Sequence, residues 1–135
     1  MIFGQEHFEK FTFTREQIKK YFDSAKESLK IAESTGIPEV IFKFSYDALI
    51  KMGLTLIAFK GYRIKSRDGH HMKILQSLSV VLNDSDIEAI GNKMRRQRNM
   101  DLCEGGIMIT EKQSKEYRQF VKEVATKTVK FFTHL

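Results

Sequence analysis

Residues 38–59 read PEVIFKFSYDALIKMGLTLIAF, and this stretch decides the fold. Pro38 suits the first turn of a helix, because proline lacks the backbone N–H that the first turn leaves unbonded. Apolar side chains then recur at the spacing of one helical face. They are Ile41, Phe44, Ala48, Leu49, Met52, Leu56 and Phe59. We therefore expect a long helix here, buried as the central helix of the domain.

Other amphipathic segments flank this helix on both sides. Upstream, Thr14 and Gln17 have the spacing of a capping box, in which each side chain bonds the other residue's backbone N–H. Apolar residues from Ile18 to Ala32 follow at helical spacing, and Gly36 ends that helix. The same signals predict three more helices, over residues 71–82, from Ser85 to about Cys103, and from Thr110 to beyond Phe131, with capping boxes at Ser85 with Glu88 and at Thr110 with Gln113.

The composition favours helix over strand, since the chain has one proline, few glycines and many Lys, Glu, Ile, Leu and Phe residues. We expect an all-α fold of five helices, with an up-and-down four-helix-bundle core and one extra helix that caps the core or pairs with another subunit. Residues 1–135 form one domain in this interpretation, with residues 1–12 as a loosely ordered arm and residues 61–69 as a linker.

Several protein classes conflict with this sequence. A single cysteine excludes an intrachain disulfide and suits a reducing cytosol, so we expect a cytoplasmic protein. The longest apolar run, Leu49 to Phe59, is too short to cross a membrane and contains Lys51. The net charge of +6 slightly favours polyanionic partners such as RNA. Much of the positive charge lies in two clusters, Lys60 with Arg63, Lys65 and Arg67, and Lys93 with Arg95, Arg96 and Arg98.

Arg98 stands at an unusual place in the second cluster. Ile87, Ile90, Met94, Arg98 and Leu102 fall on one face of a helix, so a charge interrupts an apolar stripe. An unpaired buried guanidinium costs several kcal/mol. The position therefore indicates either a cleft that receives an anion or a structural ion pair with a buried acid such as Asp47. Arg95 and Arg96 also suit an ordinary solvated helix terminus.

Two histidines and the cysteine are further candidates. His70 and His71 are adjacent and cannot share one helical face, so they do not form a metal pair, and we expect neither a metal nor a cofactor. They either cap the third helix or pack against a neighbour, or one of them approaches Arg98 from that helix. Cys103 suits a small buried hydrophobe better than a nucleophile, because no histidine near it in sequence would activate it.

The order of these features resembles the HEPN domains (higher eukaryotes and prokaryotes nucleotide-binding). The resemblance covers residues 10–132 and rests on the long aromatic-rich second helix, on Gly69-His70-His71, and on the run Met94-Arg95-Arg96-Gln97-Arg98-Asn99. It implies a helical homodimer, in many cases partnered by a minimal nucleotidyltransferase in a toxin–antitoxin pair. It also implies metal-independent ribonuclease activity from an arginine, a polar residue and a histidine four to six residues further on, with two such motifs meeting across the dimer.

On this pattern the arginine is Arg98 and the polar residue Asn99, but Cys103 stands at the first histidine position and no histidine follows before His134. A thiol transfers protons poorly near neutrality, whereas imidazole suits both proton transfers of RNA cleavage. The resemblance therefore implies a nucleotide- or RNA-binding homodimer without efficient cleavage. Its phosphate-binding residues would be Arg95, Arg98, Asn99, His70 and His71. The alternative is an active endoribonuclease that uses Arg98 with Cys103, His70 or His71.

Overall fold

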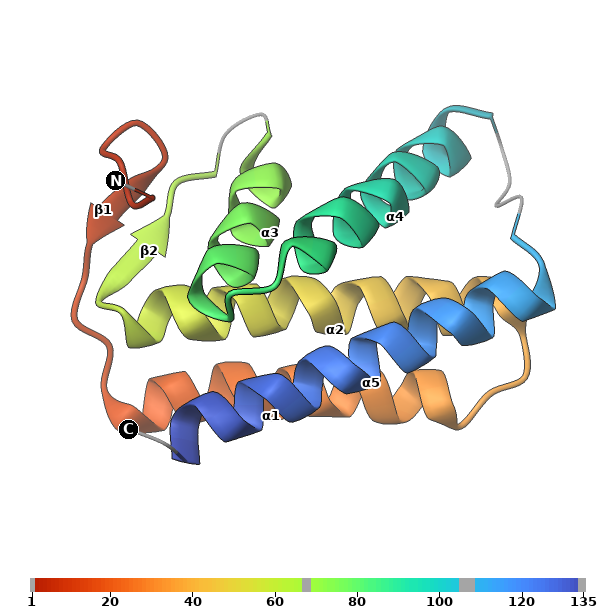
Figure 1. Ribbon diagram of the computed structural model, residues 1–135, viewed down its shortest axis with the longest axis horizontal. Coiled ribbons are helices and arrows are strands. Elements are labelled where there is room, and N and C mark those ends of the chain that lie inside the picture. Colours follow the sequence, from red (N-terminus) through yellow and green to blue (C-terminus); the bar gives the residue numbers. More distant parts are fainter. Residues whose placement is uncertain (1, 67–68, 105–108, 134–135) are drawn as a thin grey trace.

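The computed structural model describes residues 2–66, 69–104 and 109–133, except for the side chains of residues 101–104 (Figure 1). Five helices and one small antiparallel sheet make up this part of the chain, so the all-α class is confirmed. In chain order the elements are β1 (Phe8–Lys10), α1 (Arg15–Glu33), α2 (Pro38–Phe59), β2 (Tyr62–Ile64), α3 (His70–Val81), α4 (Ser85–Glu104) and α5 (Glu111–Thr133).

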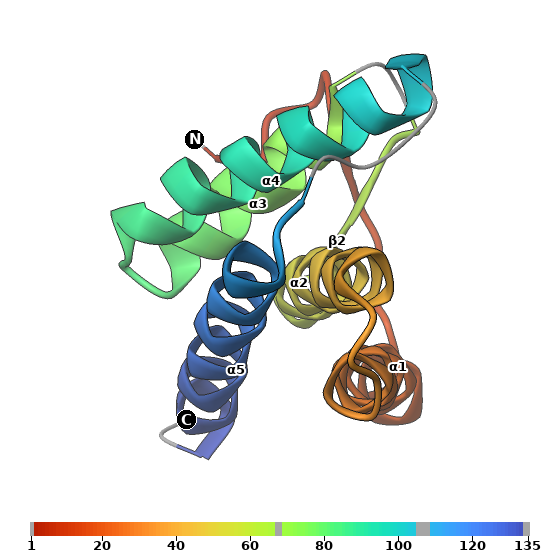
Figure 2. The ribbon, with the colours of Figure 1, turned by 90° about the vertical axis from the view of Figure 1, so that its right-hand side faces the viewer.

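The helices form two groups. In Figure 1, α1 and α2 lie side by side and run in opposite directions, while α5 packs along α2 and runs in the same direction as α2. The view down α2 in Figure 2 shows that α3 and α4 lie together on the other side of α2 from α1. Because α5 does not alternate in direction with α2 and the α3–α4 pair lies across α2, the structure does not confirm the expected up-and-down topology.

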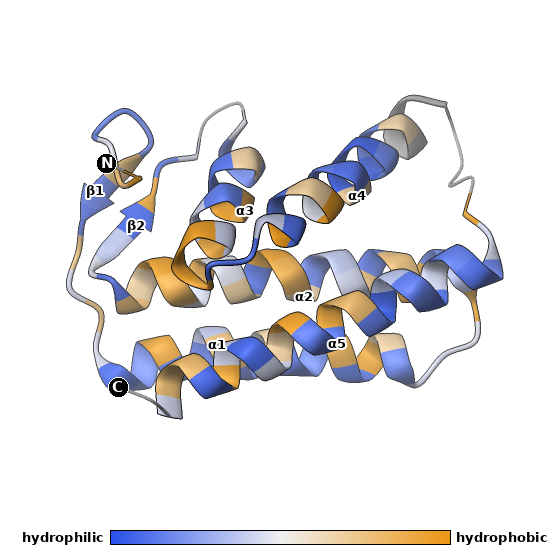
Figure 3. Ribbon diagram, viewed as in Figure 1, coloured by the Kyte–Doolittle hydropathy of each residue, from blue (hydrophilic) through white to orange (hydrophobic). Residues whose placement is uncertain are grey.

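The helix α2 is central, as predicted. It begins at Pro38 and contacts α1, α3, α4, α5 and β2. Figure 3 shows apolar residues along most of α2, whereas α1 and α5 alternate between apolar and polar faces. Of the predicted apolar residues, Phe44 is half-buried and Phe59 remains 38% exposed at the end of the helix. The others are fully buried, namely Ile41, Ala48, Leu49, Met52 and Leu56.

The predicted helix starts are confirmed to different degrees. Thr14 and Gln17 form the full capping box of α1. At α4, however, the backbone N–H of Asp86 donates to the Asp84 side chain at 3.0 Å, so the cap lies one residue before the predicted Ser85. At α5, Thr110 accepts from the Gln113 backbone as expected. The Gln113 side chain is used elsewhere, accepting from Gln97 of α4 at 3.0 Å.

Two predictions about non-helical segments need correction. The segment expected as a loose arm contains β1, which pairs with β2 inside the segment expected as a linker. Phe8 is only 2% exposed, so burial of its ring anchors the strand. Across the ribbon the Arg63 guanidinium donates to the Glu9 carboxylate at 2.5 Å and lies over the Phe11 ring. Much of the N-terminal segment is therefore held against the domain.

Close approach at Gly91 sets the position of the α3–α4 pair. A side-chain carbon at Gly91 would lie 2.6 Å from Leu75 Cδ2, inside van der Waals contact, so a larger residue here would require the buried Leu75 side chain to shift. None of the helices, over the residues described, has an apolar stretch long enough to cross a membrane.

Candidate functional site

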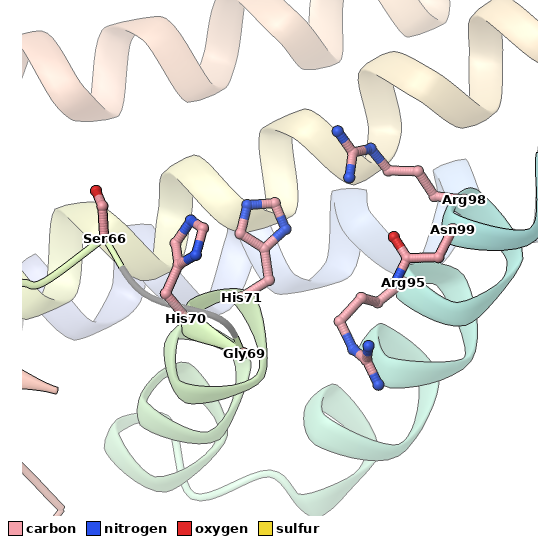
Figure 4. Close-up of a pocket in the computed structure, with 7 residues that line it drawn as sticks. All are labelled: Ser66, Gly69, His70, His71, Arg95, Arg98 and Asn99. Carbon is pink, nitrogen blue, oxygen red and sulfur yellow. The ribbon is translucent and has the colours of Figure 1, made fainter. Parts of the chain in front are cut away.

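A pocket of about 520 Å³ opens between the start of α3 and the second half of α4 (Figure 4). The positive φ of Gly69, +79°, lets the chain turn sharply into α3 and brings the two histidines to the mouth of the pocket. The described residues that line it are Ser66, Gly69, His70, His71, Arg95, Arg98 and Asn99. All five residues predicted to bind phosphate therefore line one cavity, and they come from two helices, α3 and α4.

The α4 side of the pocket carries the positive charge. Met94 is fully buried, but one turn later α4 rises away from α2, and Arg98 is exposed instead of continuing the buried stripe. Its guanidinium lies over the Tyr46 ring of α2, 5.7 Å from the ring centre. Arg95 is half-buried and donates to the Asn92 side chain at 3.1 Å. In Figure 4 the amide of Asn99 lies between the two guanidinium groups.

The α3 side of the pocket carries two imidazole rings. His71 Nδ1 lies 2.8 Å from the hydroxyl oxygen of Tyr46, which is 3% exposed, so one nitrogen of this ring is held by the core. The rings of His70 and His71 meet edge to face with their centres 4.6 Å apart. Figure 4 shows His71 between His70 and the two arginines.

Burial and positive charge keep the imidazole of His71 neutral. Burial lowers the pKa of His71 to about 4, and His70, Arg98 and Arg95 act in the same direction against a weaker opposing effect of Asp47. Burial raises the pKa of Tyr46 to about 12, although the two arginines oppose this shift. Near neutral pH the pocket therefore holds two permanent guanidinium charges beside the neutral imidazole of His71, whose Nδ1 is paired with the neutral, buried phenol of Tyr46.

The alternative interpretation of Arg98, a structural ion pair with a buried acid such as Asp47, is not found with Asp47. The Asp47 carboxylate binds Lys51 at 2.8 Å and accepts from Ser28 at 2.6 Å, and both partners lie away from the pocket. Within the described part of the chain, no carboxylate lies within ion-pair distance of Arg98. The charge at this position is therefore available to an external anion.

The remaining candidate residues from the sequence do not line the pocket or lie outside the described part of the chain. Arg96 is exposed and does not line the pocket, as expected for a solvated helix face. Of the first basic cluster, Arg63 pairs with Glu9 and Lys65 donates to a backbone carbonyl. Cys103 belongs to α4, but its side chain lies outside the described residues, so its proposed part in the site stays a prediction.

Sequence reasoning missed Tyr46 and Ser66. Tyr46 reads as one more aromatic residue of the central helix, and its contacts with His71 and Arg98 depend on how α3 and α4 pack on α2. A tyrosine on the helix expected to be the buried centre of the domain was the available signal, because a buried phenol needs a hydrogen-bond partner. Ser66 lies in the segment read as a linker and gave no comparable signal.

The pocket is chemically suited to anions. Two guanidinium groups, an amide and two imidazoles converge on it, and no carboxylate is present among its described lining residues. No three His, Cys, Asp or Glu side chains in the described ranges are placed to hold a metal ion. In comparisons with protein-family models, curated proteins and solved structures, none matched the chain, so the interpretation of this site rests on its own geometry.

Proposed function

We propose that this domain binds nucleotides or RNA by holding a phosphate group in the pocket between α3 and α4. One observation carries the proposal: Arg95, Arg98, Asn99, His70 and His71, from two different helices, line a single cavity. Arginine presents N–H groups in a fork that matches two phosphate oxygens, and amide and imidazole N–H groups add further donors. The arrangement thus supplies both charge and several donors for one phosphate.

The residues described favour binding over cleavage. Cleavage of RNA by its own 2′-hydroxyl needs one group to take a proton and another to give one. Guanidinium groups stay protonated near neutrality and so serve poorly as an acid or a base, and His71 stays neutral to a pH of about 4. A group with that pKa is a poor proton donor at pH 7. The domain is therefore proposed to hold its ligand without efficient turnover.

A second candidate function is that of a metal-independent endoribonuclease. The observation in its favour is that His71 lines the same pocket as Arg98, so an imidazole from α3 shares a cavity with the arginine to which the resemblance gives a catalytic role. His70 and Cys103 are the other residues proposed for this role. The resemblance also adds two partners to the proposal, a second copy of the chain and a minimal nucleotidyltransferase.

One experiment separates these functions. A fluorescent single-stranded RNA with a 5′-phosphate is incubated in metal-free buffer with the wild type, Arg98→Ala and Arg96→Ala, and both anisotropy and RNA length are followed. Arg96→Ala removes the same charge from the same helix outside the pocket. We expect intact RNA, bound by the wild type and Arg96→Ala but weakly by Arg98→Ala. Cleavage that Arg98→Ala abolishes would favour the endoribonuclease, and RNA that is neither bound nor cleaved would contradict both functions.

Cys103→His extends the same experiment. The variant places a histidine four residues after Asn99, which is the shortest spacing of the family pattern, and leaves the rest of α4 unchanged. Cleavage by this variant, with none by the wild type, is the expected result if the site holds phosphate but lacks an acid–base group. Unchanged binding without cleavage would show that the missing histidine is not what limits turnover.

A further inference from the structure

Tyr46 contacts a residue on each side of the pocket. Its hydroxyl is hydrogen-bonded to His71 Nδ1 at 2.8 Å, and the Arg98 guanidinium lies over its ring, 5.7 Å from the ring centre. The side chain comes from the central helix α2, is 3% exposed and does not itself line the cavity. A single buried residue therefore touches an imidazole of α3 and a guanidinium of α4, which are the two helices that form the pocket.

The hydrogen bond between Tyr46 and His71 determines where the imidazole carries its proton. A neutral phenol has one hydrogen to donate, and a neutral imidazole has one N–H and one acceptor nitrogen. If Nδ1 carried the hydrogen, it would donate to the phenol oxygen, and the buried phenol hydrogen would need another acceptor. Within the described residues, His71 Nδ1 is the one hydrogen-bond partner of the Tyr46 hydroxyl. Satisfying the phenol thus requires that Nδ1 accepts and that Nε2 carries the hydrogen.

We infer that Tyr46 is a positioning residue of the pocket, whose buried hydroxyl fixes His71 in the Nε2–H tautomer so that the imidazole offers a hydrogen-bond donor to a bound phosphate. The inference rests on the proposed function for the identity of the ligand, but not for the tautomer itself. The surroundings of His71 favour a neutral ring: burial, His70 of α3 and Arg98 and Arg95 of α4 lower its pKa, and Asp47 of α2 opposes them more weakly.

This tautomer gives His71 a defined chemical role. A neutral ring with Nε2–H can donate to a phosphate oxygen, whereas it cannot take a proton at Nε2 and its Nδ1 is already engaged. His71 in this form is a ligand-binding donor and not a general base. The same phenol that orients His71 also supports Arg98, so one buried side chain arranges two of the donors that the phosphate meets.

The tautomer is tested first, in the absence of ligand. Protein labelled with ¹⁵N at histidine is studied by long-range ¹H–¹⁵N NMR near pH 7, for the wild type, Tyr46→Phe and Tyr117→Phe. Tyr117→Phe is a matched control, because Tyr117 is also a buried tyrosine of the core and its hydroxyl donates to Gln97 instead of a histidine. We expect a protonated Nε2 and an unprotonated Nδ1 for His71 in the wild type and in Tyr117→Phe, and a mixture of tautomers in Tyr46→Phe. A protonated Nδ1 or a mixture in the wild type overturns the inference.

Binding of inorganic phosphate then tests the positioning role. Loss of one hydrogen bond to the ligand predicts a reduction in affinity of about tenfold for His71→Ala, and a smaller reduction for Tyr46→Phe. In a double variant, Tyr46→Phe should add almost nothing to His71→Ala, because the hydroxyl acts through the imidazole. Additive losses, or full affinity in a folded Tyr46→Phe, overturn the positioning role. If the wild type binds no phosphate, the proposed function fails, while the NMR result still decides the tautomer.

Discussion

Replacing Arg98 with alanine separates a ligand-binding arginine from a structural one. The side chain is exposed, and its guanidinium lies over the Tyr46 ring, 5.7 Å from the ring centre. A cation–π contact at an exposed site contributes about 0.5–1 kcal/mol, so Arg98→Ala should lower the free energy of unfolding by no more than that. Hydrogen bonds to a charged partner contribute about 1.5–3 kcal/mol, so phosphate affinity should fall by roughly tenfold to 150-fold.

The assay needs both quantities from the same samples. Isothermal titration with inorganic phosphate gives the affinity, and urea unfolding gives the stability, for the wild type, Arg98→Ala and Arg96→Ala. Arg96→Ala should change neither quantity appreciably, because its side chain is exposed and lies outside the pocket. A loss of about 3–5 kcal/mol of stability with unchanged phosphate binding, the signature of a broken buried ion pair, would refute the reasoning.

Three further predictions concern packing, pH and assembly. Gly91→Ala should lower the free energy of unfolding by about 1–3 kcal/mol, because the added carbon meets Leu75 at 2.6 Å; chemical denaturation checks this, and a more stable variant would contradict it. The lowered pKa of His71 means that the unfolded chain binds a proton more readily than the folded one. The free energy of unfolding should therefore fall as the pH drops from about 6.5 to about 4, and in His71→Gln it should fall less over the same pH range. Sedimentation at micromolar concentration should give twice the 15.8 kDa chain mass if the homodimer implied by the resemblance forms, whereas a single 15.8 kDa species would contradict it.

Local signals were the predictable part of this fold. The capping box of Thr14 with Gln17 and the helix beginning at Pro38 depend on residues a few positions apart, and both are found as expected. The strands β1 and β2 have three residues each, too few to show the alternation by which a strand is recognised in sequence. The two strands pair with each other across more than fifty positions of sequence, and no local pattern predicts such a pairing.

The candidate site was predictable in its residues but not in its geometry. Periodicity placed Arg98 on the buried stripe of its helix, and that would hold if α4 followed α2 along its whole length. Instead α4 leaves α2 after Met94, and this divergence exposes Arg98 and opens the pocket beside it. The role of Tyr46 depends on three helices meeting, so it became visible only once their packing was known.

Titration of ¹⁵N-labelled protein with adenosine 5′-monophosphate and, separately, with adenosine tests the central claim most directly. The two probes differ by the phosphate alone. The account predicts that the monophosphate shifts the backbone amide signals of Gly69, His71 and Asn99, which line the pocket, and that adenosine leaves them in place. Equal shifts with both probes, or shifts confined to residues far from the pocket, would contradict the claim that this cavity holds a phosphate group.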